Sequence, residues 1–206
     1  MTRFLFILFI LLPFFSDAQD SLRYDTLIKN NAYQSYYSKK YKAPVAVKYT
    51  LYHGGGECSR EKMDFKNDIK GLKTAYDSDY RGSGYDKGHM ANAEDFAYDC
   101  TLEELTFRYY NCAPQTPELN RGPWKQFETV IRNLSQTDSL IVVCYNEFDG
   151  KKTKNVYVPY KCYKFVYDIK TKTIVHAFYF TNTATPKFVD VRKKIKSYKF
   201  ITDILK

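Results

Sequence analysis

The middle of the chain contains the sequence Tyr85-Asp86-Lys87-Gly88-His89-Met90-Ala91-Asn92-Ala93-Glu94-Asp95-Phe96. Within it an acid, a base, a glycine and an imidazole follow one another from Asp86 to His89. Four such residues can also form a solvated turn, so a functional role for this stretch needs support from the rest of the chain. Imidazole is the most common general base near neutral pH, which makes His89 the first candidate for chemistry.

The two other histidines are weaker candidates. His53 begins His53-Gly54-Gly55-Gly56, which is similar to the glycine loop that forms half of a lipase oxyanion hole. Such a hydrolase also needs a G-x-S-x-G nucleophile motif, and the sequence contains none. His176 lies in an aromatic stretch that is typical of a packed strand. A serine hydrolase is therefore disfavoured.

A helix is predicted a short distance after the His89 motif. Pro123 suits a first helical position. Apolar residues then recur at helical spacing, namely Trp124, Phe127, Ile131 and Leu134. Glu128 lies beside this stripe, where an unpaired carboxylate is costly, and Arg132 one turn later is its expected partner. Asn120, just before the helix, is equally suited to be a cap.

The two segments together resemble the DNA/RNA non-specific endonuclease family of ββα-metal nucleases. The family signature is an Asp-Arg-Gly-His segment followed by a segment with asparagines and a glutamate. This chain has Tyr85 to Phe96, Asn111 to Gln115 and Asn120 to Glu128 in that order. The similarity extends from about Pro44 through Arg132 and more loosely to Phe180. It implies that a ββα-metal motif carries the active site.

The resemblance also implies roles for the matching residues. His89 corresponds to the general base, Asn120 to the direct metal ligand, and Glu128 to the acid that holds metal-bound water. Asn111 corresponds to a neighbouring site residue with a supporting polar role. Arg132 corresponds to a helix arginine near the scissile phosphate.

Lys87 departs from the family pattern, which has arginine between the aspartate and the glycine. Lysine is still a cation that binds phosphate, but it is a point charge without the planar pair of donors. We therefore expect activity to survive with altered strength and Lys87 to contact substrate. Arg60 matches another phosphate-contacting arginine of the family, in a region where the alignment is loose.

The implied activity is metal-dependent hydrolysis of phosphodiester bonds in DNA and RNA with little sequence preference. Cleavage needs a deprotonated water, neutralised phosphoryl charge and a stabilised leaving oxygen. An imidazole, basic side chains and a hydrated Mg²⁺ supply these, and Mn²⁺ or another divalent cation can substitute. An unperturbed histidine base would lose activity as the pH falls through about 6 to 7. The alternatives are an inactive relative that only binds nucleic acid and a membrane-surface protein.

The composition fits one exported globular domain. The 206 residues are 44% hydrophobic and 27% charged, which excludes a long disordered tract and a polytopic membrane protein. A basic start, an apolar run from Phe4 to Phe15 and small residues after it predict a cleaved signal peptide over residues 1–18. We expect residues 19–206 to form a single domain with its core at about 44–206. The mature protein is expected to be secreted or periplasmic, without stable membrane association.

Positive charge is concentrated at the carboxy-terminal end. The formal net charge is +9. Residues 151–206 contain 14 lysines or arginines and three acids, a net +11, which leaves −2 for the first 150 residues. Such a segment can attract nucleic acid or an anionic membrane, or can simply favour solubility. The 20 tyrosines could stack on unpaired bases, although most are expected to pack in sheets.

Short β-branched and aromatic stretches predict a mostly antiparallel sheet, and with few helices they indicate an α+β fold. Alternation predicts one strand from Val45 to Tyr52 that ends at a run of glycines. Residues 20–43 show little periodicity. The other expected strands cover Leu140–Tyr145, Asn155–Val158, Tyr160–Tyr167 and Thr173–Phe180.

Five cysteines bear on the compartment. They are Cys58, Cys100, Cys112, Cys144 and Cys162. In an exported protein some of them should be paired. Two pairs and one free thiol could be chosen in 15 ways, and the sequence does not decide among them. A zinc site is disfavoured, because no C-x-x-C occurs and only three histidines are present.

Overall fold

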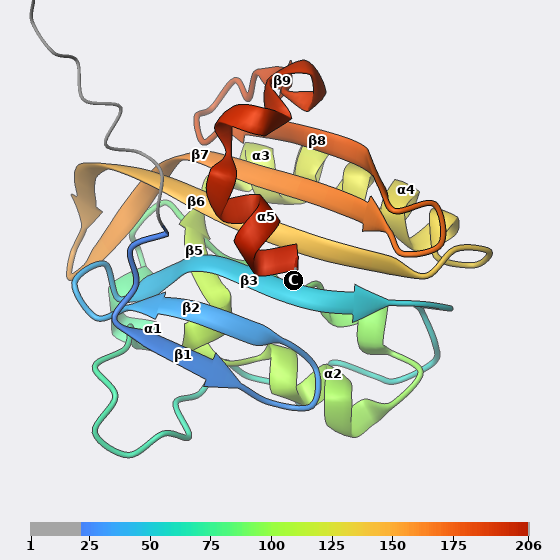
Figure 1. Ribbon diagram of the computed structural model, residues 1–206. Coiled ribbons are helices and arrows are strands. Elements are labelled where there is room, and N and C mark those ends of the chain that lie inside the picture. Colours follow the sequence, from blue (N-terminus) through green and yellow to red (C-terminus); the bar gives the residue numbers. More distant parts are fainter. Residues whose placement is uncertain (1–21, 206) are drawn as a thin grey trace, which may run out of the picture.

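A seven-stranded antiparallel sheet runs through the molecule in the order β1-β2-β3-β6-β7-β8-β9 (Figure 1). The computed structural model describes residues 22–205, so the predicted signal peptide lies outside the described residues. The strands are β1 Thr26–Lys29, β2 Gln34–Ser38, β3 Ala43–Leu51, β6 Leu140–Thr153, β7 Val156–Asp168, β8 Thr173–Thr181 and β9 Phe188–Asp190. Within residues 22–205, no helix has the length and apolar character needed to cross a membrane.

A second, two-stranded antiparallel sheet pairs β4, Asp86–His89, with β5, Cys112–Gln115. The α-helices are α1 Asp77–Tyr80, α2 Cys100–Thr106, α3 Pro117–Leu119, α4 Lys125–Leu134 and α5 Lys199–Leu205. Short helical turns of other types are η1 Ala93–Phe96, η2 Tyr109–Asn111, η3 Asn120–Trp124 and η4 Arg192–Ser197. Long antiparallel strands with a few helices give the expected α+β fold.

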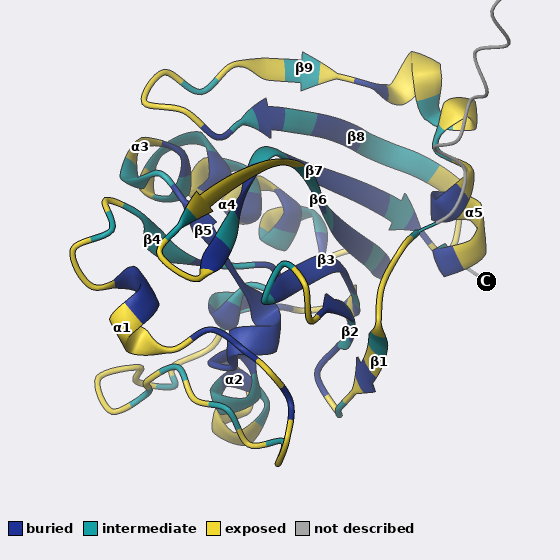
Figure 2. Ribbon diagram, turned by 90° about the vertical axis from the view of Figure 1, so that its left-hand side faces the viewer, coloured by how far each residue is buried: buried dark blue, intermediate teal, exposed yellow. Residues whose placement is uncertain are grey.

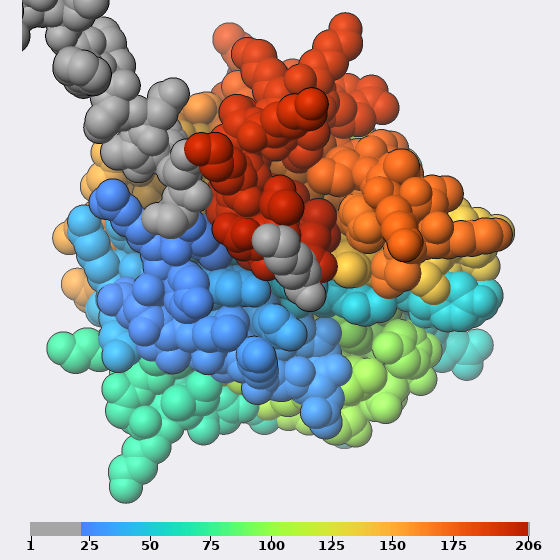
Figure 3. Space-filling model, viewed as in Figure 1, coloured from blue at the N-terminus to red at the C-terminus, as the bar shows by residue number. Residues whose placement is uncertain are grey.

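The large sheet is covered on both faces (Figures 1 and 2). On one face Ile131 of α4 packs in a core with Val142 of β6. On the other face Ile201 of α5 packs in a core with Val143 of β6. Neighbouring residues of a strand point to opposite faces, which explains why Val142 and Val143 belong to different cores. Figure 3 shows the carboxy-terminal segment lying over the face that α4 does not cover.

The sheet begins earlier than residue 44, where the core was expected to start. Residues 20–43 contain both β1 and β2, and β2 pairs with β3. Tyr33 and Tyr37 from this segment are buried. Strands of four and five residues are too short to show a period, so their identity comes from pairing against β3.

Strand β7 joins two stretches that were expected to be separate strands. It runs without interruption from Val156 to Asp168 and includes Pro159. Proline cannot donate a hydrogen bond to a neighbouring strand. Pro159 is tolerated because it lies opposite Phe148, where the pairing with β6 changes register. The other expected strands are confirmed, and β6 extends beyond the expected end at Tyr145.

The predicted helix is confirmed, although the helical path starts before it. Regular α-helix begins at Lys125, directly after Pro123 and Trp124. The preceding turn η3 contains Gly122 with a non-helical backbone (φ −97°, ψ −116°), which marks a kink. Asn120 is therefore part of a helical turn rather than the cap of α4, and its N–H donates to the carbonyl of Thr116.

One disulfide is present among the described residues, which agrees with the expectation that some of the cysteines are paired. It joins Cys58 to Cys100, whose Cα atoms lie 5.3 Å apart. Cys112, Cys144 and Cys162 are buried free thiols. Cys144 faces Lys164 across β6 and β7, so it is only diagonal to Cys162. Diagonal Cα atoms lie about 7–8 Å apart, beyond the usual span of a disulfide.

Candidate active site

The ββα arrangement places His89 beside helix α4. His89 ends strand β4 opposite Cys112 of β5, and the chain then leads through α3 and η3 into α4. Gly88 allows this close pairing, because a Cβ atom there would overlap the side chain of Gln115. The motif around His89 thus lies at one edge of a compact site.

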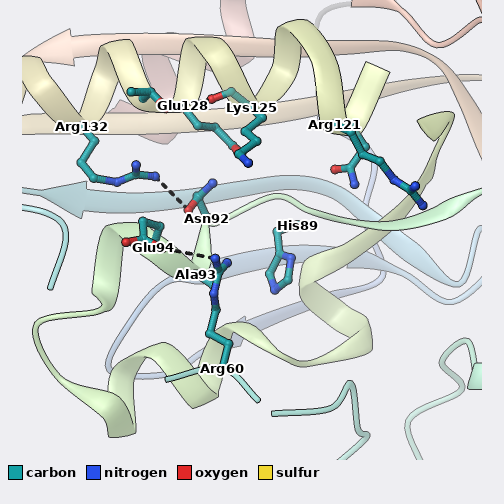
Figure 4. Close-up of a pocket in the computed structure, with 11 residues that line it drawn as sticks. Arg60, His89, Asn92, Ala93, Glu94, Arg121, Lys125, Glu128 and Arg132 are labelled. Atoms are coloured by element: carbon teal, nitrogen blue, oxygen red, sulfur yellow. Dashed lines mark hydrogen bonds and ion pairs between the residues drawn. The ribbon is translucent and has the colours of Figure 1, made fainter. Parts of the chain in front are cut away.

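A cavity of about 550 Å³ lies between α4 and the segment from His89 to Glu94 (Figure 4). Its walls are formed by Arg60, His89, Asn92, Ala93, Glu94, Asn120, Arg121, Lys125, Glu128, Thr129 and Arg132. Five residues singled out from the sequence therefore meet in one place. These five are Arg60, His89, Asn120, Glu128 and Arg132.

The imidazole of His89 is held by aromatic rings. The centroid of Phe65 lies 4.7 Å from that of His89, and the centroid of Phe107 lies 4.8 Å away. The Nε2 atom is enclosed and has no hydrogen-bond partner in the described part of the chain. Burial, aided by the positive charge of Arg60, lowers the pKa of His89 to about 3. His89 is therefore neutral at pH 7, and the acid loss expected for an unperturbed imidazole at pH 6 to 7 does not apply.

Asn120 is oriented by the first acid of the motif. Its Nδ2 donates to Oδ2 of Asp86 at 3.0 Å. Arg121 holds the same carboxylate through Nε at 2.8 Å and Nη2 at 2.6 Å. Although burial acts in the opposite direction, these bonds lower the pKa of Asp86. Because the amide nitrogen is engaged, the carboxamide oxygen of Asn120 is the atom left to serve as a ligand.

Glu128 is paired, but not with Arg132 as expected. Its Oε1 accepts a hydrogen bond from Nζ of Lys164 on β7 at 3.0 Å, and both side chains are buried. Burial alone would lower the pKa of Lys164, but the charge of Glu128 raises it. Arg132 instead donates to Asp95 at 2.9 Å and to Asn92 at 3.2 Å. Residues four apart lie on one side of a helix. Glu128 and Arg132 nevertheless bind partners from other elements and not each other.

Arg60 enters the cavity from the loop that follows Cys58. Its guanidinium lies 3.3 Å from Glu94 and 3.6 Å from Glu103. The disulfide to Cys100 anchors this loop on α2. Arg60 therefore lies in the wall of the cavity, and its contact with phosphate stays a prediction.

Two residues with expected site roles lie outside the cavity wall. Lys87 pairs with Asp77 at 2.8 Å and lies over the ring of Phe65, so its charge is used beside the site rather than in it. Asn111 is fully buried. Its Oδ1 accepts from the backbone N–H of Ala91 and its Nδ2 donates to the Ala91 carbonyl, which holds the chain just after His89. Asn111 is therefore a positioning residue.

Some site residues were missed from the sequence. Arg121 and Lys125 add positive charge to the cavity wall. Lys164 could have been found, because it lies between Cys162 and Val166 on the core-facing side of a strand, where a lysine requires a buried partner. Asp95 gave no comparable signal, since its contact with Arg132 joins positions 37 residues apart.

The charge of the cavity suits a phosphate. Four cations line it, Arg60, Arg121, Lys125 and Arg132, against two acids, Glu94 and Glu128. Figure 4 shows the Lys125 side chain extending from α4 into the cavity. Among residues 22–205, no ion pair engages Lys125. A phosphate group can neutralise such a net positive site.

The donor set fits a hydrated hard cation rather than a fully protein-bound one. No group of three or more His, Cys, Asp or Glu side chains within the described chain is arranged to hold a metal. The oriented carboxamide oxygen of Asn120 and the second carboxylate oxygen of Glu128 remain in the cavity wall. Mg²⁺ prefers oxygen ligands and keeps several waters, which agrees with one direct and one outer ligand.

A family model described as DNA/RNA non-specific endonuclease matches residues 14–205. The chain belongs to the DNA/RNA non-specific endonuclease family. Mitochondrial endonuclease G of Bos taurus is 35% identical over 115 residues, which cover 52% of this chain and 37% of the bovine protein. Nuclease C1 of Cunninghamella echinulata is 28% identical over 176 residues, or 74% of this chain and 67% of the fungal protein.

The fold agrees with this family. The crystal structure of an EndoG/EndoGI complex contains a chain that matches with a TM-score of 0.69 and 26% identity, covering 83% of this chain and 82% of that one. The matched region spans little more than a third of the length of mitochondrial endonuclease G. Membership of the endonuclease family thus confirms the resemblance inferred from the motif.

Proposed function

We propose that the protein is a divalent-metal-dependent endonuclease that hydrolyses phosphodiester bonds in DNA and RNA with little base preference. The observation that carries this proposal is the convergence of His89 and Asn120 on one cavity lined by four cations. Membership of the endonuclease family supports it. Nothing in the cavity wall resembles a module that reads base edges, and contacts to phosphate carry no sequence information.

Neutral His89 acts as the general base. It accepts a proton from a water that attacks phosphorus, and this requires an unprotonated imidazole. Phe65 and Phe107 hold the ring in one orientation. Arg132, fixed by Asp95 and Asn92, and Lys125 bind the phosphoryl oxygens. Attack by water with departure of the 3′ oxygen leaves 5′-phosphate ends.

Asn120 and Glu128 are the residues that would hold a metal ion, the first directly and the second through water. A bound Mg²⁺, or Mn²⁺ in its place, supplies charge stabilisation for the leaving oxygen. Asp86 positions Asn120 through the amide nitrogen. Lys164 fixes the carboxylate of Glu128 from the sheet side. The roles of these two partners are to orient, not to react.

We also propose that the protein acts outside the cytoplasm, either secreted or in a periplasm. The amino-terminal sequence supports this, and so does the Cys58–Cys100 disulfide, since disulfides persist in oxidising compartments. DNA and RNA are the proposed partners. Extracellular nucleic acid is then the natural substrate.

The deciding experiment incubates the purified mature chain with plasmid DNA and with RNA, with Mg²⁺ and with EDTA. We expect wild type to cleave both only with the metal, and His89→Ala to reduce turnover at least about 100-fold. His176→Ala is the matched control, since His176 lies on β8 away from the cavity wall. Binding of both polymers without any cleavage would instead favour the inactive, binding-only relative.

A second measurement tests the metal ligand. Asn120→Ala should shift the Mg²⁺ concentration needed for half-maximal activity upward by at least about 10-fold, while substrate affinity changes little. Calorimetric titration of Mn²⁺ into wild type and variant reports the same loss without turnover. An unchanged titration would show that Asn120 is not the ligand.

A further inference from the structure

A second hollow shares a wall with the candidate active-site cavity. It has a volume of about 400 Å³, and its lining includes Tyr49, Tyr52, Phe96 and Tyr98. Segment 92–98 separates the two spaces, because Asn92, Ala93 and Glu94 line the first while Phe96 and Tyr98 line the second. If a nucleic acid chain binds in the first cavity, its next nucleotide can therefore reach the second hollow.

The shared wall is rigidly connected to the candidate site. The hydroxyl of Tyr49, in the second hollow, donates to Oδ2 of Asp95 at 2.8 Å. The other oxygen of Asp95 accepts from Nε of Arg132, in the first cavity, at 2.9 Å. Asp95 is buried between them. The position of the hollow relative to Arg132 is thus fixed by two hydrogen bonds.

The glycine run that follows His53 lies close to residues of both spaces. A Cβ atom at Gly54 or Gly55 would lie 3.4 or 3.5 Å from the side chain of Arg132. At Gly56, with φ +153°, it would overlap the backbone of Ala97 and Tyr98. Because glycines have no side chains, this loop can lie close both to Arg132 and to the backbone of Tyr98.

The chemistry of the hollow suits a nucleobase. Tyr52 and Tyr98 are large aromatic residues that remain 52% and 56% exposed. Asn31 and Gln34 also line the hollow and offer amide donors and acceptors. Lys48 is the lysine of this wall, and its Nζ donates to the carbonyl of Ile204. Flat faces and amides, without a free cation, match a base rather than a phosphate.

We propose that Tyr52 and Tyr98 form a stacking subsite for an unpaired nucleobase next to the phosphate being cleaved. The proposal rests on the proposed nuclease function. Bases in a duplex have their faces covered by stacking, so only single-stranded substrate can use the subsite. It would give this enzyme a preference for single strands without any base preference, because every base has an aromatic face.

The test compares cleavage of one sequence as a single strand and as a duplex. We expect the double variant Tyr52→Ala/Tyr98→Ala to raise KM for the single strand by at least about 5-fold and to leave the duplex within about 2-fold. Tyr52→Phe/Tyr98→Phe should retain the wild-type ratio, because phenylalanine keeps the stacking face. Tyr76→Ala, equally exposed at 56% and located before α1, is the control that should change neither KM.

The outcomes separate this proposal from the proposed function. If wild type cleaves and the double alanine variant keeps the wild-type ratio, or loses both substrates equally, the subsite is wrong and the nuclease function stands. If wild type cleaves neither substrate, the nuclease function fails. The subsite is then judged by fluorescence anisotropy of a labelled oligothymidylate in EDTA. A selective loss of single-strand affinity in the double alanine variant supports it, and unchanged affinity overturns it.

Discussion

The imidazole of His89 packs between Phe65 and Phe107. Its burial makes the free energy of unfolding depend on pH. An unfolded histidine titrates near 6.5, whereas burial lowers the pKa of folded His89 to about 3. Between these pH values the unfolded chain binds a proton that the folded chain excludes. The stabilising contribution is thus complete above pH 6.5 and is lost as the pH falls, by up to about 1.4 kcal/mol per pH unit.

A variant without the imidazole should lose less stability in acid than wild type. Urea unfolding of wild type and His89→Gln is measured in EDTA at pH 7.5 and at pH 5.0. Between the two pH values we expect wild type to lose about 2 kcal/mol more of its free energy of unfolding than the variant. Equal losses would show that His89 is not kept neutral by the fold.

Lys125 is the cavity cation without an ion pair among the described residues, so its charge is available to the substrate. We expect Lys125→Gln to lower kcat/KM by about 10-fold and to reduce the slope of log affinity against log salt by about one. Lys87→Gln should cost less, because Lys87 already pairs with Asp77 outside the cavity. Kinetics over a range of salt concentrations measure both effects, and Lys170→Gln, in the exposed turn after β7, serves as control. If Lys87→Gln lowered kcat/KM more than Lys125→Gln, Lys87 and not Lys125 would be the residue that contacts the phosphate.

At the scale of elements, one buried ion pair ties helix α4 to strand β7. Glu128 and Lys164 are both buried, and the Lys164 ammonium also lies 4.3 Å from the centre of the Trp124 ring. Removing one charge leaves the other buried without its partner. We expect Glu128→Gln to lower the free energy of unfolding by about 3–5 kcal/mol. Denaturant unfolding at pH 7.5 measures this loss.

The paired replacement separates stability from activity. Glu128→Leu/Lys164→Met removes both charges, so it should regain most of the lost stability. It should be inactive, because the carboxylate of Glu128, which is proposed to hold water around the metal, has been removed. Restored activity in this double variant would mean that Glu128 serves only the packing of α4.

Local patterns predicted the elements of the site better than the contacts between them. The stripe that starts at Trp124 identified α4, and the motif around His89 identified the family, because both signals lie within a few residues. The partners of Glu128 and Arg132 come from β7 and from η1, 36 and 37 residues away in the sequence. Such pairs depend on how the elements pack, which no local spacing encodes. Strand β2 was missed for the same reason, since its pairing with β3 defines it.

At the scale of the whole molecule, overall charge and site charge come from different parts of the chain. The positive excess belongs to residues 151–206, yet the four cavity cations all come from the first 150 residues, whose formal net charge is −2. Helices η4 and α5, which end this basic segment, pack on the face of the sheet opposite α4 (Figure 3). Under the proposed function, the basic segment would raise the rate of encounter with nucleic acid, and the cavity would supply the contacts at the cleaved bond.

The disulfide connects the stability of the molecule to its compartment. It joins Cys58 to Cys100, which are 42 positions apart, and the closed loop includes Arg60 and the whole of β4. Restricting such a loop in the unfolded chain is worth about 2–4 kcal/mol. We expect reduction with dithiothreitol, or the variant Cys58→Ser/Cys100→Ser, to lower the free energy of unfolding by that amount.

Reduction should also raise KM, since Arg60 lies two residues from Cys58 and its side chain is already half exposed. The serine double variant is the control for the reagent, because its remaining cysteines are buried and unpaired, so dithiothreitol should change it no further. Unfolding in urea and steady-state cleavage, each with and without the reductant, measure the two effects. If reduction left both stability and KM unchanged, the loop would be held by its other contacts, such as the bond from the Cys58 N–H to the Ala97 carbonyl. The disulfide would then give no reason to place the working enzyme in an oxidising compartment.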